Sequence, residues 1–591
     1  MYGWNGKVLR INLTNMEYRA ENIEEKILKE YIGGRGLGAK ILYDEVKPDV
    51  DPLSEQNKLI FSVGPLTGTA APTAGRYSVT AKSPLTGTIF DANSGGHFGV
   101  EIKRAGYDAI IVEGCAEKLT YVFIKNEEVV FGDATALSGM DTYKTTEQIL
   151  ASTDRNAKVG CIGPAGEKLL LISCIINDRN RAAGRGGLGA VMGSKKLKAI
   201  AVLGTREIKV SNAERFERAR KSAMEAIAKN PITKDALPNY GTAVLVNLIN
   251  EIGALPTRNY QDGTFRDADA ISGETLRERI FVRKSACASC PIACARITKV
   301  GDEEGEGPEY ETVWAFGADC GINDIEKIAV ANYKCNRYGL DTISTGATIA
   351  CAMEMSEKGL LTDYIRFGDA DLMLALIDKI GRCEGIGEKL GKGSLRFARE
   401  YGGEEYSMSV KGLELPAYDP RGIQGMGLAY ATSNRGGCHL RGYMTAPEVL
   451  GNPYLVDRFA TEGKAGLTIL LQNISAAVDT LVMCRFSQFA LNPEHYAELL
   501  SAATGVEYSD MDLLRVGERI YNIERVYNVR AGVDKDSLPE RLLSDPLSEG
   551  HSKGHVVHLK VMLDEYYRLR GWDEIGNPLP DTLRKLGIEG E

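Results

Sequence analysis

The sequence has few histidines and tryptophans and lacks any long apolar run. Six of its 591 residues are His and three are Trp. The longest apolar run, Leu169 to Ile176, is far below the roughly 18 to 20 residues that a helix needs to span a bilayer. The first residues, MYGWNGKVLRINLTN, have no charged segment followed by an apolar one, as a secretion signal would. The sequence therefore predicts a cytoplasmic protein without a membrane segment.

The sequence also lacks a block of basic residues. Its 71 Lys and Arg against 80 Asp and Glu give a formal charge of -9. Because no cluster of Lys or Arg is present to release counterions from a phosphate backbone, nucleic acid is not an expected partner. Apolar residues make up 43% of the chain, which is enough for several well-filled domains at this length.

Most cysteines are scattered, but Cys287, Cys290 and Cys294 occur together in CASCPIAC. Three thiolates without a nearby histidine select zinc or an iron–sulfur cluster, and the second close pair typical of a zinc ribbon is missing. A fourth ligand from a remote position is then the most economical solution, and Cys484 is our candidate for it. The alternative is a disulfide, which is rare in the cytosol, or three buried thiols.

Strand-like and helix-like segments are separated along the chain. Up to about residue 208, short β-rich runs such as KVLRINL and LKAIAVLG are bounded by Gly, Asp and Asn. From there on, apolar residues recur at three- and four-residue spacing, and a Pro- and Gly-rich stretch near residue 413 marks a second boundary. We predict an α+β fold with a β-rich domain over 1–208 and mainly helical domains over 209–413 and 414–591.

Two similar Gly- and Arg-rich turns, at 33–40 and 184–195, interrupt the strand-like region. The second matches G-x-G-x-x-G through Gly184, Gly186 and Gly189, a nicotinamide-binding pattern. That pattern requires a strand that leads directly into the turn, whereas NDRNRAA before it has the composition of a polar loop. We therefore favour two loops whose backbone N–H groups and arginines approach another anion, such as phosphate.

Few histidines are available for catalysis or metal binding. His551, His555 and His558 have the spacing of one helix face near the start of the last expected helix, and they form either a metal site or a packed stripe. His97, in a glycine-rich turn, fits either a packing role or a place near a bound cofactor, and His495 fits an ordinary helix start after Pro493. His439, in RGGCHLRG, is the remaining candidate for acid–base chemistry.

A series of distinctive stretches runs through the whole chain. They are GGRGLGAK, GPLTGT, PTAGRYSVTAKSPLTGT, NSGGHFG, NRAAGRGGLGAVMGSKKLKAI, CASCPIAC, EGPEYET, YGLDTISTG, LPAYDPRGIQGMGLAYATSNRGGCHLRG and VDTLVMC. In this order they resemble the tungsten-containing aldehyde:ferredoxin oxidoreductase family, whose members carry a bis-pyranopterin cofactor and one 4Fe–4S cluster. The resemblance implies that the β-rich domain forms a base for the pterins and that the two helical domains close over them.

The resemblance assigns ligands to both cofactors. The cluster ligands fall on Cys287, Cys290, Cys294 and Cys484. The two pterin motifs, of the form Asp-x-x-Gly-Leu-(Asp or Cys), fall on Asn336, Gly339, Leu340 and Asp341, and on Asp479, Val482, Met483 and Cys484. Two positions depart from the motif, because Asn336 loses the charge and Val482 replaces a glycine. An easy positive φ is therefore not expected at Val482.

The family's phosphate and magnesium contacts fall on the β-rich region. Arg76 and Arg181 would face the cofactor phosphates. The backbone carbonyls of Asn93 and Ala182 would bind a Mg2+ ion that joins the phosphates. A solvated charge at a strand end is the alternative for Arg76. Arg441 would hold a pterin or a substrate carboxylate, with a surface role as its alternative.

The resemblance also implies an active site. Glu311 and His439 match the family's acid–base pair, Tyr418 would donate its hydroxyl to the substrate oxygen, and Glu309 is the alternative carboxylate. Oxidation of an aldehyde to an acid needs a base, because protons leave as the C–O bond forms. We expect an apolar cavity to raise the pKa of the carboxylate. Electrons would pass through the pterin and the cluster to ferredoxin or a small ferredoxin-like subunit.

Other functions compete with this one. The chain could be the tungsten catalytic subunit of a larger complex, either an aromatic acyl-CoA ring reductase or an NAD-linked aldehyde oxidoreductase. A bare electron-carrier subunit would not need Glu311, Tyr418 and His439. The sequence specifies neither tungsten over molybdenum nor one aldehyde. No histidine lies between His97 and His439, so the family's histidine-bridged dimer cannot be copied, and a homo-oligomer stays an open possibility.

Overall fold

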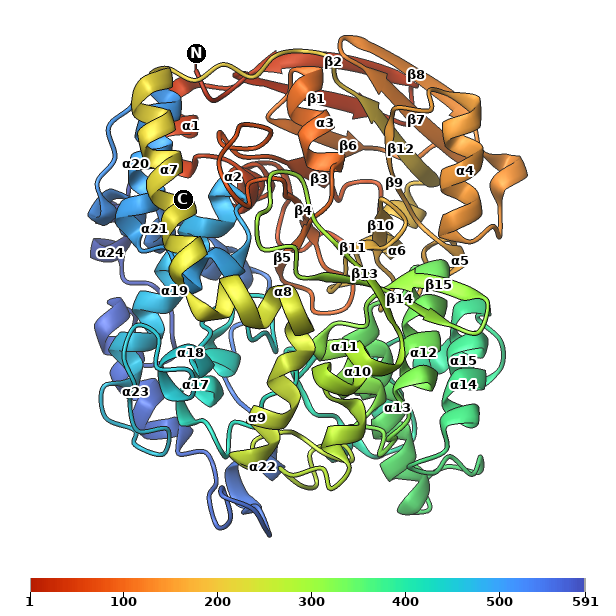
Figure 1. Cartoon of the computed structure of the whole chain (residues 1–591). Coiled ribbons are helices and arrows are strands. Elements are labelled where there is room, and N and C mark those ends of the chain that lie inside the picture. Colours follow the sequence, from red (N-terminus) through yellow and green to blue (C-terminus); the bar gives the residue numbers. More distant parts are fainter. Residues whose placement is uncertain (1, 589–591) are drawn as a thin grey trace.

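A computed structural model describes residues 2–588 (Figure 1). The N-terminal third contains two six-stranded sheets. The first has the order β2-β1-β6-β3-β4-β5, with β1 Lys7–Asn12, β2 Glu17–Asn22, β3 Leu59–Ser62, β4 Tyr77–Lys82, β5 Ile89–Ser94 and β6 Ala109–Glu113. The second has the order β11-β10-β9-β12-β7-β8, with β7 Thr120–Lys125, β8 Glu128–Asp133, β9 Lys158–Cys161, β10 Ile175–Asn177, β11 Arg181–Ala183 and β12 Leu197–Leu203. The edge strands β5 and β11 contact each other, so the two sheets meet at these edges.

Six helices accompany these sheets within the described residues. They are α1 Glu25–Tyr31, α2 Gly34–Glu45, α3 Phe98–Ala105, α4 Thr142–Ser152, α5 Pro164–Glu167 and α6 Leu188–Ser194. Helix α2 packs on β4 and also contacts two helices from the C-terminal part of the chain, α19 and α21. It therefore lies between the sheets and the helices that follow them.

The middle of the chain is mainly helical. Its helices are α7 Ala213–Lys229, α8 Leu237–Tyr240, α9 Leu245–Glu251, α10 Gly273–Arg279, α11 Tyr310–Phe316, α12 Ile325–Tyr338, α13 Thr342–Glu357, α14 Ala370–Arg382, α15 Ile386–Leu390 and α16 Ser394–Glu400. A three-stranded sheet of β13 Phe281–Ser285, β14 Ala295–Val300 and β15 Glu303–Glu306 interrupts them. The CASCPIAC loop connects β13 to β14.

The C-terminal part follows a two-stranded sheet of β16 Ser409–Val410 and β17 Leu413–Glu414. Its helices are α17 Gln424–Thr432, α18 Thr445–Glu448, α19 Lys464–Leu481, α20 Pro493–Thr504, α21 Asp510–Arg530, α22 Glu540–Ser544, α23 Leu559–Arg570 and α24 Pro580–Leu586. Helix α7, drawn in yellow in Figure 1, lies against α20 of this part. Helices α7 and α20 are therefore in contact although they are far apart in the sequence.

The predicted α+β class is confirmed, with the sheets first and the helices after them. The apolar core is shared between the parts of the chain. Ile110 of β6, Trp314 of α11 and Tyr430 of α17 belong to one continuous cluster of buried side chains. Because burial of apolar surface is the main stabilising term in folding, this shared core holds the sheets and helices in a fixed arrangement.

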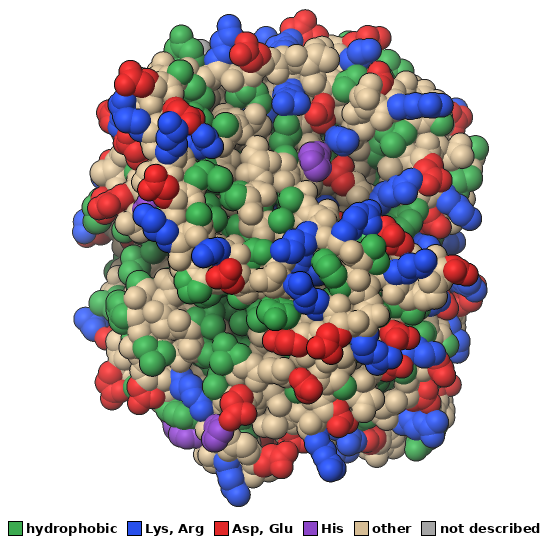
Figure 2. Space-filling view, in the orientation of Figure 1, with side chains coloured by type: hydrophobic (Ala, Val, Ile, Leu, Met, Phe, Trp, Pro, Cys, Tyr) green, Lys and Arg blue, Asp and Glu red, His purple; other side chains and the backbone are tan. Residues whose placement is uncertain are grey.

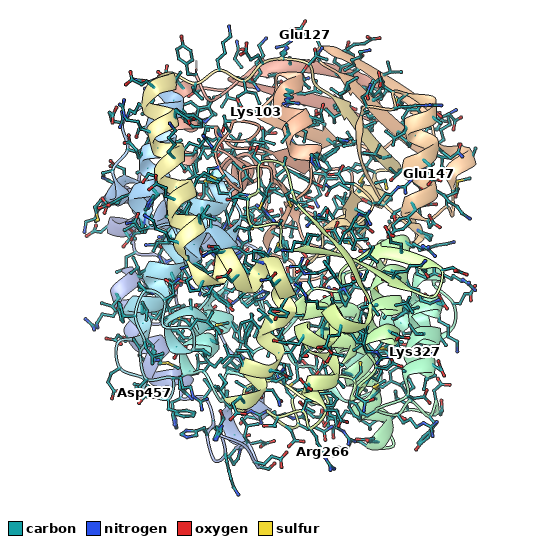
Figure 3. The ribbon with its side chains drawn as sticks, in the orientation of Figure 1. Lys103, Glu127, Glu147, Arg266, Lys327 and Asp457 are labelled. Carbon is teal, nitrogen blue, oxygen red and sulfur yellow. The ribbon has the colours of Figure 1, made fainter. Side chains whose placement is uncertain are left out.

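The surface is charged and mixed in sign. Lys and Arg are interspersed with Asp and Glu over the face in Figure 2, and hydrophobic side chains gather toward its centre and lower left. The exposed side chains of Glu127, Arg266 and Asp457 point outward at the periphery, while other side chains fill the space between the ribbons (Figure 3). Among residues 2–588, every helix is too short or too polar to traverse a bilayer.

Candidate functional site

The four predicted cluster cysteines come from two segments that are fixed by one residue of the N-terminal part. Thr73 donates its backbone N–H to the carbonyl of Ser289 in the CASCPIAC loop (2.9 Å). The carbonyl of Thr73 accepts a hydrogen bond from the N–H of Cys484 (3.0 Å), directly after α19. Thr73 therefore holds Cys484 beside the other three cysteines.

Glycines allow the CASCPIAC loop to approach the sheets closely. A Cβ on Gly95 would lie 2.7 Å from Cys287 Sγ, and one on Gly75 would lie 2.6 Å from the carbonyl oxygen of Ala288. Burial, together with the charges of Cys484 and Cys287, raises the pKa of Cys290 to about 11. The thiols thus lie close enough to affect one another, and they must lose protons to bind a metal. Four such sulfurs fit an iron–sulfur cluster that is held by cysteine thiolates alone.

The two Gly- and Arg-rich turns each contact one of the predicted pterin motifs. At the start of α2, Arg35 Nη1 lies 3.3 Å from Asp479 Oδ2. Before α6, Arg185 Nε lies 3.5 Å from Asp341 Oδ2. A Cβ on Gly184 would lie 3.3 Å from Asp341 Oδ1. The repeated sequence thus produces two comparable half-sites, each with a glycine turn, an arginine and a carboxylate.

The two motifs end their helices in the same conformation. Gly339 (φ 71°) ends α12, and Val482 (φ 51°) ends α19. The sequence predicted that Val482 would not adopt a positive φ, and this prediction is wrong. The residue is left-handed, although this conformation costs a non-glycine residue roughly 1–2 kcal/mol. Its side chain packs against glycine backbone, because a Cβ on Gly64 would lie 2.7 Å from Val482 Cγ2.

The other motif residues line the same turns. Asp341 accepts a hydrogen bond from the N–H of Ser344 (3.0 Å) and so caps α13. Leu340 bridges to Ser173 at the end of the second sheet. Asn336 is buried, and its carbonyl accepts a hydrogen bond from Thr142 (2.8 Å).

The predicted phosphate and magnesium residues gather where β5 and β11 meet. Arg76 donates from Nη2 to the carbonyl of Asn93 on β5 (3.2 Å), and its Nη1 lies 3.9 Å from Cys484 Sγ. Arg181 on β11 pairs with Glu306 (2.7 Å) and is little exposed, while Ala182 beside it is exposed. Arg76 is therefore engaged with both Asn93 and a cluster cysteine, rather than being a solvated charge.

A buried ion network surrounds the half-site that contains Asp479. Arg441 donates to Asp479 Oδ2 (2.7 Å) and also to the Asp91 side chain. Arg35 binds Glu524 through two hydrogen bonds of 2.7 and 2.6 Å. All five side chains are at most 7% exposed. Arg441 thus connects a sheet residue to the pterin motif, which excludes a surface role for it.

Arg485 is a half-buried cation. Neither Nη1 nor Nη2 has a hydrogen-bond acceptor within the described residues, and burial lowers the pKa of the guanidinium, although the charge of Asp479 acts to raise it. Asn93 Nδ2 is also buried without a hydrogen-bond partner there. Unpaired buried donors are costly, and native proteins pair them with ligands or water when they are retained. These donors fit an anionic, hydrogen-bonding group such as a pterin phosphate.

We expect Arg485→Met to separate cofactor binding from stability. In the cofactor-free protein, removal of an unpaired buried charge should raise the free energy of unfolding by about 1–3 kcal/mol, measured by urea denaturation. Tungsten content after cofactor loading should fall about tenfold. Arg525→Met is the control, because Arg525 is paired with Asp536 (2.9 Å) and its loss should destabilise the protein. If both variants were destabilised alike, Arg485 would have a partner in the folded chain.

The three predicted catalytic side chains lie together. Glu311 Oε1 on α11 is 3.4 Å from His439 Nε2, and these side chains are 15% and 12% exposed. The ring of Tyr418 is 5.7 Å from that of His439. Glu309 instead accepts a hydrogen bond from Thr242 (2.5 Å). Glu311, and not Glu309, is therefore the carboxylate beside His439.

The environment sets the protonation of this group. Burial raises the pKa of Glu311 to about 8, while the N–H of Ala417 and the charge of Arg185 act in the opposite direction. The expected upward shift is thus confirmed. Burial, followed by the charges of Arg185 and Arg435, holds the pKa of His439 well below its usual value. At pH 7 both groups are mostly uncharged, and the proton resides on Glu311.

The structure adds two residues that sequence reasoning missed. Tyr443 Oη lies 3.1 Å from Tyr418 Oη. Cys438 accepts hydrogen bonds at Sγ from Arg435 Nη2 (2.9 Å) and from the N–H of Leu440 (3.3 Å). Burial raises the pKa of this thiol, but the charges of Arg435 and Arg441 outweigh it and lower the pKa. Both residues are within four positions of His439 in the sequence, and this proximity is the signal that could have identified them.

The remaining histidines do not form a metal site. His551 binds the carbonyl of Glu251 (2.6 Å), His555 stacks on Phe459 (3.8 Å between ring centroids), and His558 precedes α23. Within residues 2–588, none of these histidines is grouped with two other His, Cys, Asp or Glu side chains that could hold a metal ion with it. His97 begins α3 with a half-exposed side chain.

The segment before Gly184 differs from expectation. It forms a strand, β11, and not the expected polar loop, because Arg181–Ala183 pairs with β10 in a hairpin. This strand is antiparallel and lies at the sheet edge, so it does not belong to the parallel βαβ unit of a nicotinamide fold.

Comparisons with known proteins cover the whole chain. Residues 8–204 match the aldehyde ferredoxin oxidoreductase N-terminal domain, and residues 218–588 match domains 2 and 3 of the same family. A tungsten-containing aldehyde ferredoxin oxidoreductase of Pyrococcus furiosus is 48% identical, over 100% of this chain and 99% of the relative. The WOR-like subunit of an aliphatic sulfonate oxidoreductase from the same organism is 30% identical, over 100% and 97%.

A solved structure shares the fold. The active-site complex BamBC of benzoyl coenzyme A reductase, with 1,5-dienoyl-CoA, is 25% identical and aligns with a TM-score of 0.86 over 99% of this chain and 97% of that one. With both family matches and close full-length relatives, the chain belongs to the aldehyde ferredoxin oxidoreductase family.

Proposed function

We propose that this protein oxidises aldehydes to carboxylic acids at a tungsten bis-pyranopterin centre and passes the electrons through a 4Fe–4S cluster to ferredoxin or a small ferredoxin-like subunit. The observation that carries the proposal is the contact between Glu311 and His439, 3.4 Å apart, beside Tyr418. The overall conversion is RCHO + H2O → RCOOH + 2H+ + 2e−. A group that exchanges protons near neutral pH is required for it.

Both cofactors have candidate ligands in this arrangement. Cys287, Cys290, Cys294 and Cys484 would hold the cluster. The pterins would lie between the Gly- and Arg-rich turns and the two motifs, with Arg76 and Arg181 toward the phosphates and carbonyls of Asn93 and Ala182 toward Mg2+. When bound, the tungsten centre supplies the acceptor for the two electrons.

The protein's own residues would orient the substrate and move its protons. The hydroxyl of Tyr418 would donate to the aldehyde oxygen, and Tyr443 Oη, 3.1 Å away, would hold that hydroxyl in place. His439, which is neutral at pH 7, would donate a second hydrogen bond to the same oxygen. Glu311 in its ionised form would accept a proton released as the C–O bond forms. The buried position of all three side chains would keep bulk water away.

A second candidate is reduction of an aromatic acyl-CoA ring. It is favoured by the full-length likeness to the benzoyl coenzyme A reductase complex. The 48% identity to an aldehyde ferredoxin oxidoreductase supports the first candidate more strongly.

Anaerobically purified enzyme tests the two candidates directly. We expect tungsten and iron in elemental analysis, and reduction of ferredoxin or viologen by short, aromatic or acidic aldehydes. A substrate panel containing benzoyl-CoA is the comparison. Activity with the thioester and none with any aldehyde would replace the first candidate with the second, and molybdenum in place of tungsten would correct the metal.

A further inference from the structure

The loop 416–419 beside Glu311 is fixed at successive backbone groups. The N–H of Ala417 donates to Glu311 Oε2 (3.0 Å), and the carbonyl of Ala417 accepts from Tyr310 Oη (2.7 Å). The carbonyl of Tyr418 accepts from Tyr430 Oη (3.1 Å). The carbonyl of Pro416 accepts from Tyr260 Oη. Buried tyrosine hydroxyls thus hold this loop from several sides.

Tyr260 and Glu311 bind opposite ends of one peptide group. The carbonyl of Pro416 and the N–H of Ala417 belong to the same peptide unit. A hydrogen bond donated to its oxygen polarises the unit and strengthens its N–H as a donor. Because this N–H stabilises ionised Glu311, the hydroxyl of Tyr260 acts on the carboxylate through the peptide.

Tyr260 lies in an unusual turn. Arg258, Asn259 and Tyr260 have φ angles of 50°, 57° and 61°, so three consecutive non-glycine residues are left-handed. Non-glycine residues visit this region singly as a rule. Such strain persists only where surrounding contacts enforce it, and it concentrates at functional sites.

Contacts on both sides enforce the turn. The N–H of Asn259 donates to Asp319 Oδ1 (3.0 Å), and its side chain donates to Glu354 Oε2 (2.6 Å). Arg421 donates to the carbonyl of Tyr260 (2.6 Å) and pairs with Asp419 (2.7 Å). Since Asp419 ends the loop 416–419, Tyr260 is tied to this loop through both its hydroxyl and its carbonyl.

We propose that Tyr260 is a positioning residue that sets the proton affinity of Glu311 through the peptide between Pro416 and Ala417. The proposal rests on the assignment of Glu311 as the active-site carboxylate. Tyr260 touches neither substrate nor cofactor in this role.

Tyr260→Phe in the metal-loaded enzyme tests this inference. Without the hydroxyl, ionised Glu311 loses stabilisation, so the ionisation near pH 8 in the pH profile of kcat/KM should move upward by about 1 unit. Below that pH, kcat/KM should fall about tenfold. The infrared band of the protonated Glu311 carboxyl can be assigned by its absence in Glu311→Gln. In Tyr260→Phe this band should disappear at a pH about 1 unit higher than in the wild type, and this measurement does not depend on turnover.

Two matched variants serve as controls. Tyr430→Phe removes a hydroxyl that donates to the carbonyl of Tyr418, which belongs to a different peptide group from the one that contacts Glu311. The ionisation of Glu311 should therefore stay at the wild-type pH. Tyr333→Phe removes a buried hydroxyl that bonds Thr298 (2.6 Å) and should leave the activity unchanged. Metal analysis shows whether each variant is loaded, and the infrared titration applies equally to a poorly loaded Tyr260→Phe.

The outcomes separate this inference from the assignment it depends on. An unmoved ionisation in Tyr260→Phe, or an equal shift in Tyr430→Phe, would overturn the role of Tyr260. Persistence of the ionisation in Glu311→Gln would instead overturn the assignment of Glu311. A shift confined to Tyr260→Phe supports both.

Discussion

Replacing Glu311 with Gln is expected to lower kcat/KM for aldehydes by about 10³-fold and to abolish the ionisation near pH 8. Gln keeps the size of the side chain and its contact with the N–H of Ala417, but it cannot accept a proton. In the wild-type enzyme, kcat/KM should rise with pH through this ionisation, because more Glu311 becomes ionised. The measurement is the pH dependence of kcat/KM for one aldehyde with saturating ferredoxin or viologen.

Glu309→Gln is the natural control for this substitution. Its side chain bonds Thr242, so the ionisation near pH 8 should survive there. A profile that loses the ionisation in Glu309→Gln, and keeps it in Glu311→Gln, would exchange the roles of the two carboxylates.

Glu311→Gln should also change the pH dependence of stability. The pKa of Glu311 rises from 4.5 to about 8 on folding, so between these values the folded protein binds more protons than the unfolded chain. Stability of the wild type must therefore fall as pH rises through this interval, and the Glu311→Gln variant escapes that loss. Its melting temperature should exceed that of the wild type by a margin that grows from acidic pH to pH 8.

Replacing Cys484 with Ser should remove the iron–sulfur cluster and slow reduction of ferredoxin more than about a hundredfold. The hydroxyl of Ser is a poor ligand for iron in comparison with a thiolate. Because Cys484 directly follows α19, the cluster signal in electron paramagnetic resonance and the tungsten content should be measured separately. The iron content is expected to fall.

Cys383→Ser provides the comparison, since Cys383 is a partly exposed free thiol at the end of α14. Iron, tungsten and activity should be retained in that variant. An intact cluster signal in Cys484→Ser would mean that a different side chain is the fourth ligand.

The sequence was informative wherever function depends on a residue type at a fixed spacing. CASCPIAC predicted three ligands, and the two Gly- and Arg-rich turns lie beside Asp341 and Asp479. Thr73 could not be identified in this way, because it holds Cys484 and Ser289 through backbone groups that every residue possesses.

The sequence patterns did not predict which polar side chains of the site are buried. Arg485 and Cys438 have ordinary sequence contexts, and their importance arises only when tertiary packing removes water from an unpaired guanidinium and a thiol surrounded by arginines. Val482 was judged from its intrinsic backbone preference, which the packing against Gly64 overrides. Helix and strand composition thus predicted the fold class, while desolvation decided the chemistry of the site.

The depth of the ion network formed by Arg35, Asp91, Arg441, Asp479 and Glu524 has a consequence for kinetic work. Dissolved salt weakens interactions between exposed charges with a screening length of about 8 Å at physiological ionic strength, but it penetrates poorly to buried pairs. The electrostatic field around the half-site that contains Asp479 should therefore be the same in dilute buffer and in concentrated KCl. Any effect of KCl on the rate of ferredoxin reduction then reports the encounter of the two proteins at the surface.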